Sequence, residues 1–182
     1  EAAQMSLKVL RGVDSEVVDF TLLEDDYKKI ALVCADRNIE IHARHGKHFK
    51  LRVPRPPRCL LYERYSADLL VGASSDEVYR LSLNEGRFQS SFSVGGTGIS
   101  AFAYNQGLDL LICGGDSGKA SLVDYKTGKV AISANLNDGE SITALKQAEN
   151  NFEFFVGSSD GLVRLYDLRM NRHIIQKRSP YL

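Results

Sequence analysis

One short pattern constrains this chain most: an apolar strand, a tight turn that carries an acid, and a second strand, repeated four times along 182 residues. The four copies occupy residues 32–41, 70–81, 111–122 and 155–167. We take Cys34, Gly72, Gly114 and Gly157 as equivalent positions, which lie 38, 42 and 43 residues apart. Self-similarity at a nearly fixed period indicates a repeat architecture, because each copy builds the same structural unit.

A period of about 40–45 residues is typical of the four-stranded blades of WD40-type β-propellers. Between the copies, short runs such as residues 17–22 and 39–42 alternate apolar and polar side chains, which predicts antiparallel strands. No stretch longer than a few residues has a helical period. The sequence therefore predicts an all-β, WD40-like β-propeller of four blades, which span residues 13–53, 58–93, 98–134 and 140–178.

Both ends of this segment predict further blades. Residues 5–10 alternate apolar and polar side chains, and we expect them to be the outer strand of a preceding blade. Within the second of the four predicted blades, residues 88–92 are expected to be the outer strand. WD40 propellers commonly have seven blades, so we expect four blades of a larger, open propeller. The start at Glu1, without methionine, fits a processed or excised piece. An open segment exposes two apolar blade faces, which predicts association.

Composition excludes several partners. The chain has 23 basic and 23 acidic residues, so no net field favours nucleic acid or an anionic membrane. No apolar run approaches the roughly 20 residues that a membrane span needs. The three cysteines, Cys34, Cys59 and Cys113, have no metal-type spacing, and we interpret them as buried free thiols of a reducing compartment.

An acid stands at the turn of every repeat. These acids are Asp36, Asp76, Asp116 and Asp160. A short carboxylate accepts hydrogen bonds from backbone amides in a tight turn, and Gly118 and Gly161 supply the positive φ that such turns often need. Ion binding is the alternative, but each acid belongs to a different blade. We therefore predict that these four acids form turns.

The sequence offers no catalytic constellation. His42, His45 and His48 are three residues apart, so on a strand their side chains alternate between faces and cannot converge on one metal ion. Residues 95–98 are rich in glycine, but they lack the strand-to-helix context of a phosphate loop and are interpreted as a linker. The serine pair at residues 74–75 lacks a nucleophile-elbow sequence. We predict no enzymatic activity, cofactor, metal or small-molecule substrate.

The most suggestive surface is basic and surrounds the proline-rich linker between the first two blades. It contains Lys47 and four residues that we name the basic band: Lys50, Arg52, Arg55 and Arg58. Arginine on a rigid proline scaffold suits contact with phosphate or with acidic peptides. A solvated inter-blade loop is the alternative interpretation, and the sequence leaves both open.

The repeats resemble the WD40 family, whose terminal dipeptide is Trp-Asp. Tyr166-Asp167 is the best match and Val123-Asp124 a weaker one, while His42 and Ser82 occupy the corresponding positions of the first two repeats. The chain has no tryptophan and no Gly-His dipeptide, so the side-chain network of the family is expected to be incomplete.

A closer resemblance, to the nucleolar protein 10 family, is carried by several short segments. They are residues 14–18, 25–30, 71–75, 77–81 and 85–87, with a looser match in residues 161 and 166–169. The third repeat departs most, since residues 122–125 stand where the family has a Cys-Trp-Asp-like end. The resemblance implies a nucleolar propeller that acts in assembly of the small ribosomal subunit precursor, with assembly factors and pre-ribosomal RNA as partners.

Rigid blades that display variable loops suit a scaffold, so we expect a non-catalytic role in small-subunit (18S pre-rRNA) assembly. The alternative is a WD40 adaptor or substrate-receptor module of an unrelated complex. An enzyme would require polar groups that converge at the central channel, and the sequence does not show them.

Overall fold

Four antiparallel sheets make up this computed structural model, which describes residues 12–23, 29–43, 45–136, 139–170 and 173–178. Blade 1 contains β1 (Val17–Leu22), β2 (Ile30–Cys34), β3 (Asn38–Ala43) and β4 (Gly46–Arg52). Blade 2 contains β5 (Pro57–Glu63), β6 (Asp68–Ala73), β7 (Glu77–Ser82), β8 (Arg87–Phe88) and β9 (Phe92–Ser93). Blade 3 contains β10 (Ile99–Asn105), β11 (Leu110–Gly115), β12 (Lys119–Asp124) and β13 (Lys129–Asn135). Blade 4 contains β14 (Ile142–Gln147), β15 (Glu153–Ser158), β16 (Leu162–Asp167) and β17 (His173–Arg178).

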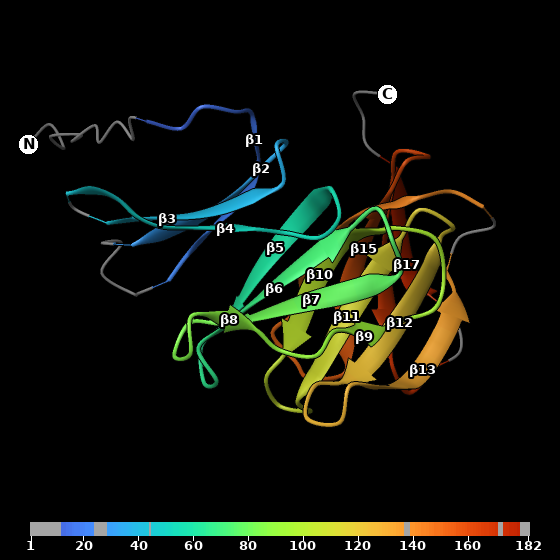
Figure 1. The fold of residues 1–182 in the computed structure, drawn as a ribbon. Coiled ribbons are helices and arrows are strands. Elements are labelled where there is room, and N and C mark those ends of the chain that lie inside the picture. Colours follow the sequence, from blue (N-terminus) through green and yellow to red (C-terminus); the bar gives the residue numbers. More distant parts are fainter. Residues whose placement is uncertain (1–11, 24–28, 44, 137–138, 171–172, 179–182) are drawn as a thin grey trace, which may run out of the picture.

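Each blade is a meander in which consecutive strands pair, because the short turns between them permit only antiparallel neighbours. The inner strands β1, β5, β10 and β14 contact one another in that order. The blades consequently follow one another in an open arc, with blade 1 at one end of the ribbon (Figure 1). The predicted all-β propeller class is confirmed, and the four sheets of the described residues do not close into a ring.

Apolar cores fill the spaces between neighbouring blades. Val33, Ile39, Leu69 and Leu81 pack between blades 1 and 2. Two similar cores separate blades 2 and 3 and blades 3 and 4. Because blade 2 is covered on both faces, all six residues of β6 are buried, and its sequence is a continuous apolar run after Asp68. Each fully buried Leu or Ile contributes roughly 1.5–3 kcal/mol.

The same irregularity occurs at the start of every inner strand. One extra residue shifts the register between Val17 and Asp19, and the same shift occurs at Pro57/Cys59, Ile99/Ala101 and Ile142/Ala144. A bulge bends the strand and increases its twist. Since the bulge occurs at one place in each blade, it provides a structural reference for aligning the four repeats.

This reference corrects one sequence alignment. Opposite the residue that follows the bulge stand Val33, Gly72, Gly114 and Gly157. The equivalent of the three glycines in blade 1 is therefore Val33, and the assignment of Cys34 was wrong by one residue. A shift of one residue moves every side chain of a strand to the opposite face, so the correction changes which residues correspond between blades.

The outer strand of blade 2 also differs from expectation. Residues 88–92 were expected as one strand, but β8 and β9 are two short pieces that pair with opposite ends of β7. Gln89 still donates its amide to the Arg80 carbonyl at 2.8 Å, and the pairing resumes one register later at Phe92. Outer strands β4, β13 and β17 have the same one-residue shift without losing their continuity.

Residues 5–10, expected as the outer strand of a preceding blade, lie outside the described residues. Within the described ranges, the structure contains no helix of sufficient length and apolar character to cross a membrane.

Candidate interaction surfaces

The four predicted turn acids lie in the turns between the second and third strands of the blades. Each turn has three residues, at 35–37, 74–76, 116–118 and 159–161. The acid is the second residue in blades 1 and 4, the third in blade 2 and the first in blade 3. The acids therefore share a turn but not a position in it, and their contacts differ accordingly.

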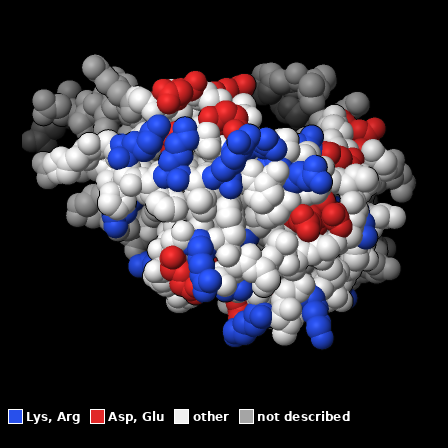
Figure 2. Space-filling model, viewed as in Figure 1, with Lys and Arg blue, Asp and Glu red and all other residues white. Residues whose placement is uncertain are grey.

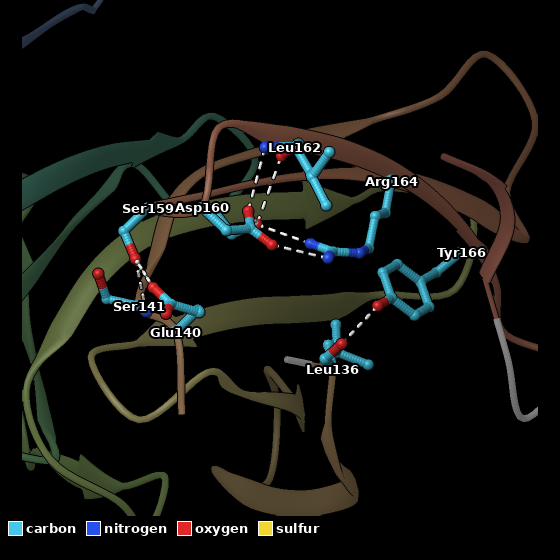
Figure 3. A network of polar contacts seen from close by, with 9 residues as sticks. Leu136, Glu140, Ser141, Ser159, Asp160, Leu162, Arg164 and Tyr166 are labelled. Carbon is cyan, nitrogen blue, oxygen red and sulfur yellow. Dashed lines mark hydrogen bonds and ion pairs between the residues drawn. The ribbon is translucent and has the colours of Figure 1, made fainter. Parts of the chain in front are cut away.

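Asp36 and Asp160 bond to their own turns. Asp36 Oδ1 accepts from the Asn38 amide at 3.2 Å, and Asp160 Oδ1 accepts from the Leu162 amide at 3.0 Å. Asp160 also accepts from Arg164 at 2.7 Å, which is the main reason that its pKa falls to about 2 (Figure 3). Both carboxylates thus hold the backbone of the turn.

The other two acids reach beyond their turns. Asp76 accepts from the Ser93 hydroxyl at the end of the same blade, whereas Asp116 in blade 3 pairs with Arg58 of blade 2. Gly118 and Gly161 have φ of +73° and +75°, as the sequence predicted. Asp116 therefore joins two blades in addition to lying in a turn.

The basic band lies at the end of the strands where these turns also lie. Lys50 and Arg52 are on β4, Arg55 is in the connection to β5, and Arg58 is at the bulge of β5. Figure 2 shows Lys and Arg side chains along the upper part of this face, over β3, β4 and the connection between β4 and β5. All four side chains are exposed.

Two members of the basic band have acidic partners. Arg58 is paired with Asp116, and Lys50 Nζ lies 3.4 Å from Glu40 Oε1. For Arg52 and Arg55 the described residues provide no acidic partner. The band is therefore not four equivalent cations, and Arg52 and Arg55 are the two that can bind an outside anion without breaking an ion pair.

Sequence reasoning missed the buried carboxylate that binds Lys50. Glu40 contacts Lys47 Nζ at 2.8 Å and His42 Nε2 at 2.9 Å, besides Lys50. Burial raises the pKa of Glu40, but the hydrogen bonds from Lys47, His42 and Lys50 lower it further, so the net shift is downward. A buried carboxylate with cations around it stabilises its strand only while those contacts persist.

His42 also stands at a different position from the expected one. In the strand pairing His42 corresponds to Leu81, Val123 and Tyr166, whereas Ala43 corresponds to Ser82, Asp124 and Asp167. The hairpin of blade 1 is two residues shorter than that of blade 2, so counting back from the glycine gave the wrong residue. In blades 3 and 4 the residue at this position is an aspartate that accepts a hydrogen bond from a backbone amide of the next turn. Asp124 accepts from the Lys126 amide at 2.9 Å, and Asp167 accepts from the Arg169 amide at 2.8 Å.

The cysteines are free thiols, as expected, and all three are buried. Burial raises the pKa of Cys59 and Cys113, which keeps both thiols protonated at neutral pH. Among the residues that the structure describes, no group of three or more His, Cys, Asp or Glu side chains could hold a metal ion.

A second surface, which sequence reasoning also missed, is a groove between blades 2 and 3 at the opposite end of the strands. Its volume is about 710 Å³. We call it the tyrosine groove, and the residues that line it are Glu63, Tyr65, Ser66, Arg80, Tyr104, Gln106, Gly107, Asp109, Tyr125 and Lys126. The signal was Arg80, a cation in a strand position that the other blades fill with apolar residues.

Comparison with known proteins agrees with this architecture. Residues 1–181 match the model of a β-propeller family described as "Nucleolar protein 10-like, N-terminal domain". The chain belongs to the nucleolar protein 10 family. The resemblance that the motifs of residues 14–92 carried is thereby confirmed over almost the whole chain.

Curated members of the nucleolar protein 10 family match along 98% of this chain. "Nucleolar protein 10" of Xenopus tropicalis is 37% identical and the human protein of that name is 33% identical, and in both the match covers 27% of the relative. "Ribosome biogenesis protein ENP2" of Saccharomyces cerevisiae is 33% identical, with 26% of its length covered. The chain thus spans about a quarter of the length of these relatives.

Proposed function

We propose that this chain is a non-catalytic WD40-type scaffold that acts in the nucleolus during ribosome biogenesis. In this proposal it serves the small-subunit (18S pre-rRNA) precursor, where it binds assembly-factor proteins and contacts pre-ribosomal RNA. The observation that carries the proposal is the match to the nucleolar protein 10 family over residues 1–181, with relatives named for the nucleolus and for ribosome biogenesis.

The architecture supports a scaffold. Rigid blades hold their connecting loops at fixed positions, and binding residues in such folds lie on those loops. The connection between β4 and β5 contains Pro54 and Pro56, which restrict its backbone, and Arg55 lies between them. We assign the RNA or acidic-peptide contact to Arg52 and Arg55, because Lys50 and Arg58 already have acidic partners.

Sedimentation of cell extract through a sucrose gradient tests the proposal, with the tagged protein followed together with precursor RNA and assembly factors. We expect the protein in fractions that contain small-subunit precursors. The variant Arg52→Ala/Arg55→Ala should remain folded and crosslink several-fold less RNA. The slope of the logarithm of its RNA-binding constant against the logarithm of the salt concentration should be smaller in magnitude by about two. The matched control is Arg87→Ala, which removes an exposed arginine at the opposite end of the strands.

Recovery with an unrelated complex and without ribosomal precursors would contradict the proposal. That result would favour the second candidate, a WD40 adaptor or substrate-receptor module elsewhere. Normal sedimentation with unchanged RNA crosslinking in the double variant would remove the basic band from the proposal and leave the scaffold role.

A further inference from the structure

The tyrosine groove has a floor that is fixed by hydrogen bonds. Glu63 accepts from the amides of Tyr65 at 2.9 Å and Ser66 at 2.8 Å, and the Ser66 hydroxyl lies 2.9 Å from Tyr125 Oη. Tyr125 in turn donates to Asp68 Oδ2 at 2.6 Å. Glu63 and Asp68 are buried, so their charges are compensated inside the protein and their side chains are held in one arrangement.

Arg80 lies above this floor. Its Nε donates to Asp68 Oδ2 at 2.6 Å, and its guanidinium carbon is 4.9 Å from the centre of the Tyr125 ring. Tyr104 meets the same ring edge-on at 5.7 Å. Within the described ranges the bond to Asp68 uses Nε alone, which leaves Nη1 and Nη2 for an acceptor in the groove. A guanidinium that is stacked and anchored at one nitrogen is preorganised to bind with the other two.

The mouth of the groove is aromatic and cationic. Tyr65, in the turn after β5, has 81% of its surface exposed, so its ring is available for stacking. Lys126, in the turn after β12, is 80% exposed and lies 2.7 Å from Asp109. Seen from the solvent, the groove thus presents the ring of Tyr65, the Nη atoms of Arg80, and the ammonium of Lys126, which keeps donors beyond its contact with the partly exposed carboxylate of Asp109.

The other inter-blade grooves differ from this one. The groove between blades 1 and 2 has Ile41 and Leu81 together with Lys29 and His48, and the groove between blades 3 and 4 has Leu122 and Ile132 together with Arg169. What sets the tyrosine groove apart is a cation on the third strand itself. Arg80 stands where blades 1, 3 and 4 have Ile41, Leu122 and Leu165. In blade 2 this position is instead held by buried Asp68 and by the ring of Tyr125, and the part of the guanidinium that they do not use faces the groove.

We propose that the tyrosine groove binds a nucleotide of single-stranded RNA, with its base stacked on Tyr65 and its acceptor atoms on Arg80 and Lys126. Exposed rings beside cations are the combination that single-stranded nucleic acids bind, because every base has a face for stacking and a phosphate for a cation. The volume of about 710 Å³ lies within the roughly 300–1,000 Å³ of small-molecule sites.

The groove lies at the end of the strands opposite the basic band, since Tyr65 and Lys126 are in the turns that follow the first and third strands of their blades. The two surfaces can therefore be altered separately. The inference rests on the proposed function only for the choice of RNA as the ligand, and the geometry of the groove stands independently of it.

Fluorescence anisotropy of a labelled oligouridine of roughly ten nucleotides with the purified protein, at about 50 mM salt, tests the proposal. We expect Tyr65→Ala to weaken binding roughly ten-fold, Tyr65→Phe to bind like the wild type, and Lys126→Glu to weaken binding several-fold. Arg80→Leu, which installs the side chain of blade 3, should also weaken binding. Its melting temperature shows whether loss of the Asp68 bond has altered the fold.

Unchanged affinity in both Tyr65→Ala and Lys126→Glu would overturn the proposal. A labelled oligoglutamate peptide that binds through Arg80 and Lys126 while oligouridine does not would also overturn it, in favour of an acidic peptide. A protein that binds no oligouridine but sediments in the precursor fractions would contradict this inference and leave the proposed function. A protein that binds oligouridine but is absent from those fractions would contradict the proposed function and leave this inference.

Discussion

Blades 3 and 4 have the same strand pattern, but the corresponding face is buried in one and open in the other. In blade 3, Ile112 and Ala120 are fully buried against blade 4. The equivalent residues of blade 4, Phe155 and Val163, are 42% and 47% exposed. The strand register around both pairs is identical, so the difference arises from the neighbour and not from the blade itself.

Each repeat therefore builds the same apolar face, whether or not a neighbouring blade covers it. Small residues line the centre of the face in both blades, Gly114 in one and Gly157 in the other. An exposed apolar face of this kind marks an interaction site. We therefore expect the face of blade 4 to receive another sheet, as the faces of blades 1, 2 and 3 do.

The largest expected difference concerns the apolar side chains. Ile112→Ala should lower the free energy of unfolding by about 2–5 kcal/mol, because it leaves a cavity between blades 3 and 4. Phe155→Ala should change it by less than about 1 kcal/mol, since that ring is 42% exposed and no described blade packs against it. Urea unfolding of the two variants measures the difference, and equal losses would show that the face of blade 4 is covered.

Replacement of the glycines on the two faces should change stability by less, for the same reason: one face is covered and the other is open. A Cβ at residue 114 would lie 2.5 Å from Ile142 Cγ2, whereas one at residue 157 would meet Ala144 Cβ at 3.4 Å, an ordinary contact. We expect Gly114→Ala to destabilise by about 1–3 kcal/mol and Gly157→Ala to be neutral or slightly stabilising. Thermal melting checks both, and a costly Gly157→Ala would contradict the open face.

The turn acids of blades 3 and 4 also differ in how deeply their ion pairs are buried. Asp160 and Arg164 are mostly buried within blade 4, while Asp116 and Arg58 are exposed between blades. Asp160→Asn should cost about 1–2 kcal/mol at pH 7 and Asp116→Asn less than about 1 kcal/mol. The pKa of Asp160 is lowered to about 2 from about 3.9 in the unfolded chain, so its contribution is complete above pH 4 and lost as the pH falls through 2.

Unfolding measurements between pH 7 and pH 2 test that sign. The gap between the wild type and Asp160→Asn should narrow as the pH falls from about 4 to about 2. A gap that stays constant over this range would show that the ion pair with Arg164 does not carry the effect.

The period of the repeats could be predicted from the sequence because glycine recurs at an equivalent position in three blades. The exact register of blade 1 could not, since the bulge and the shorter hairpin shift Cys34 and His42 by one residue and leave no composition signal. The acidic partners of the basic band could not be predicted from the sequence either. Arg58 meets Asp116, 58 residues away, only because two blades pack side by side.

The tyrosine groove was missed for a similar reason. Arg80 reads as an exposed residue of an alternating strand, and only the packing of blade 3 against blade 2 brings Tyr104 and Tyr125 to it. Aligning the third strands by their pairing, with Ile41, Leu122 and Leu165, would have marked Arg80 as unusual.

Sedimentation velocity over a range of protein concentrations tests the central claim, that the open face of blade 4 is an interface like those between the described blades. We compare the wild type with Phe155→Glu/Val163→Glu, two charges on that face, and with Arg87→Glu as a control of surface charge. We predict that the wild type and the control associate as concentration rises, while the double variant stays monomeric and folded. A monomeric wild type, or association that the double variant retains, would contradict it.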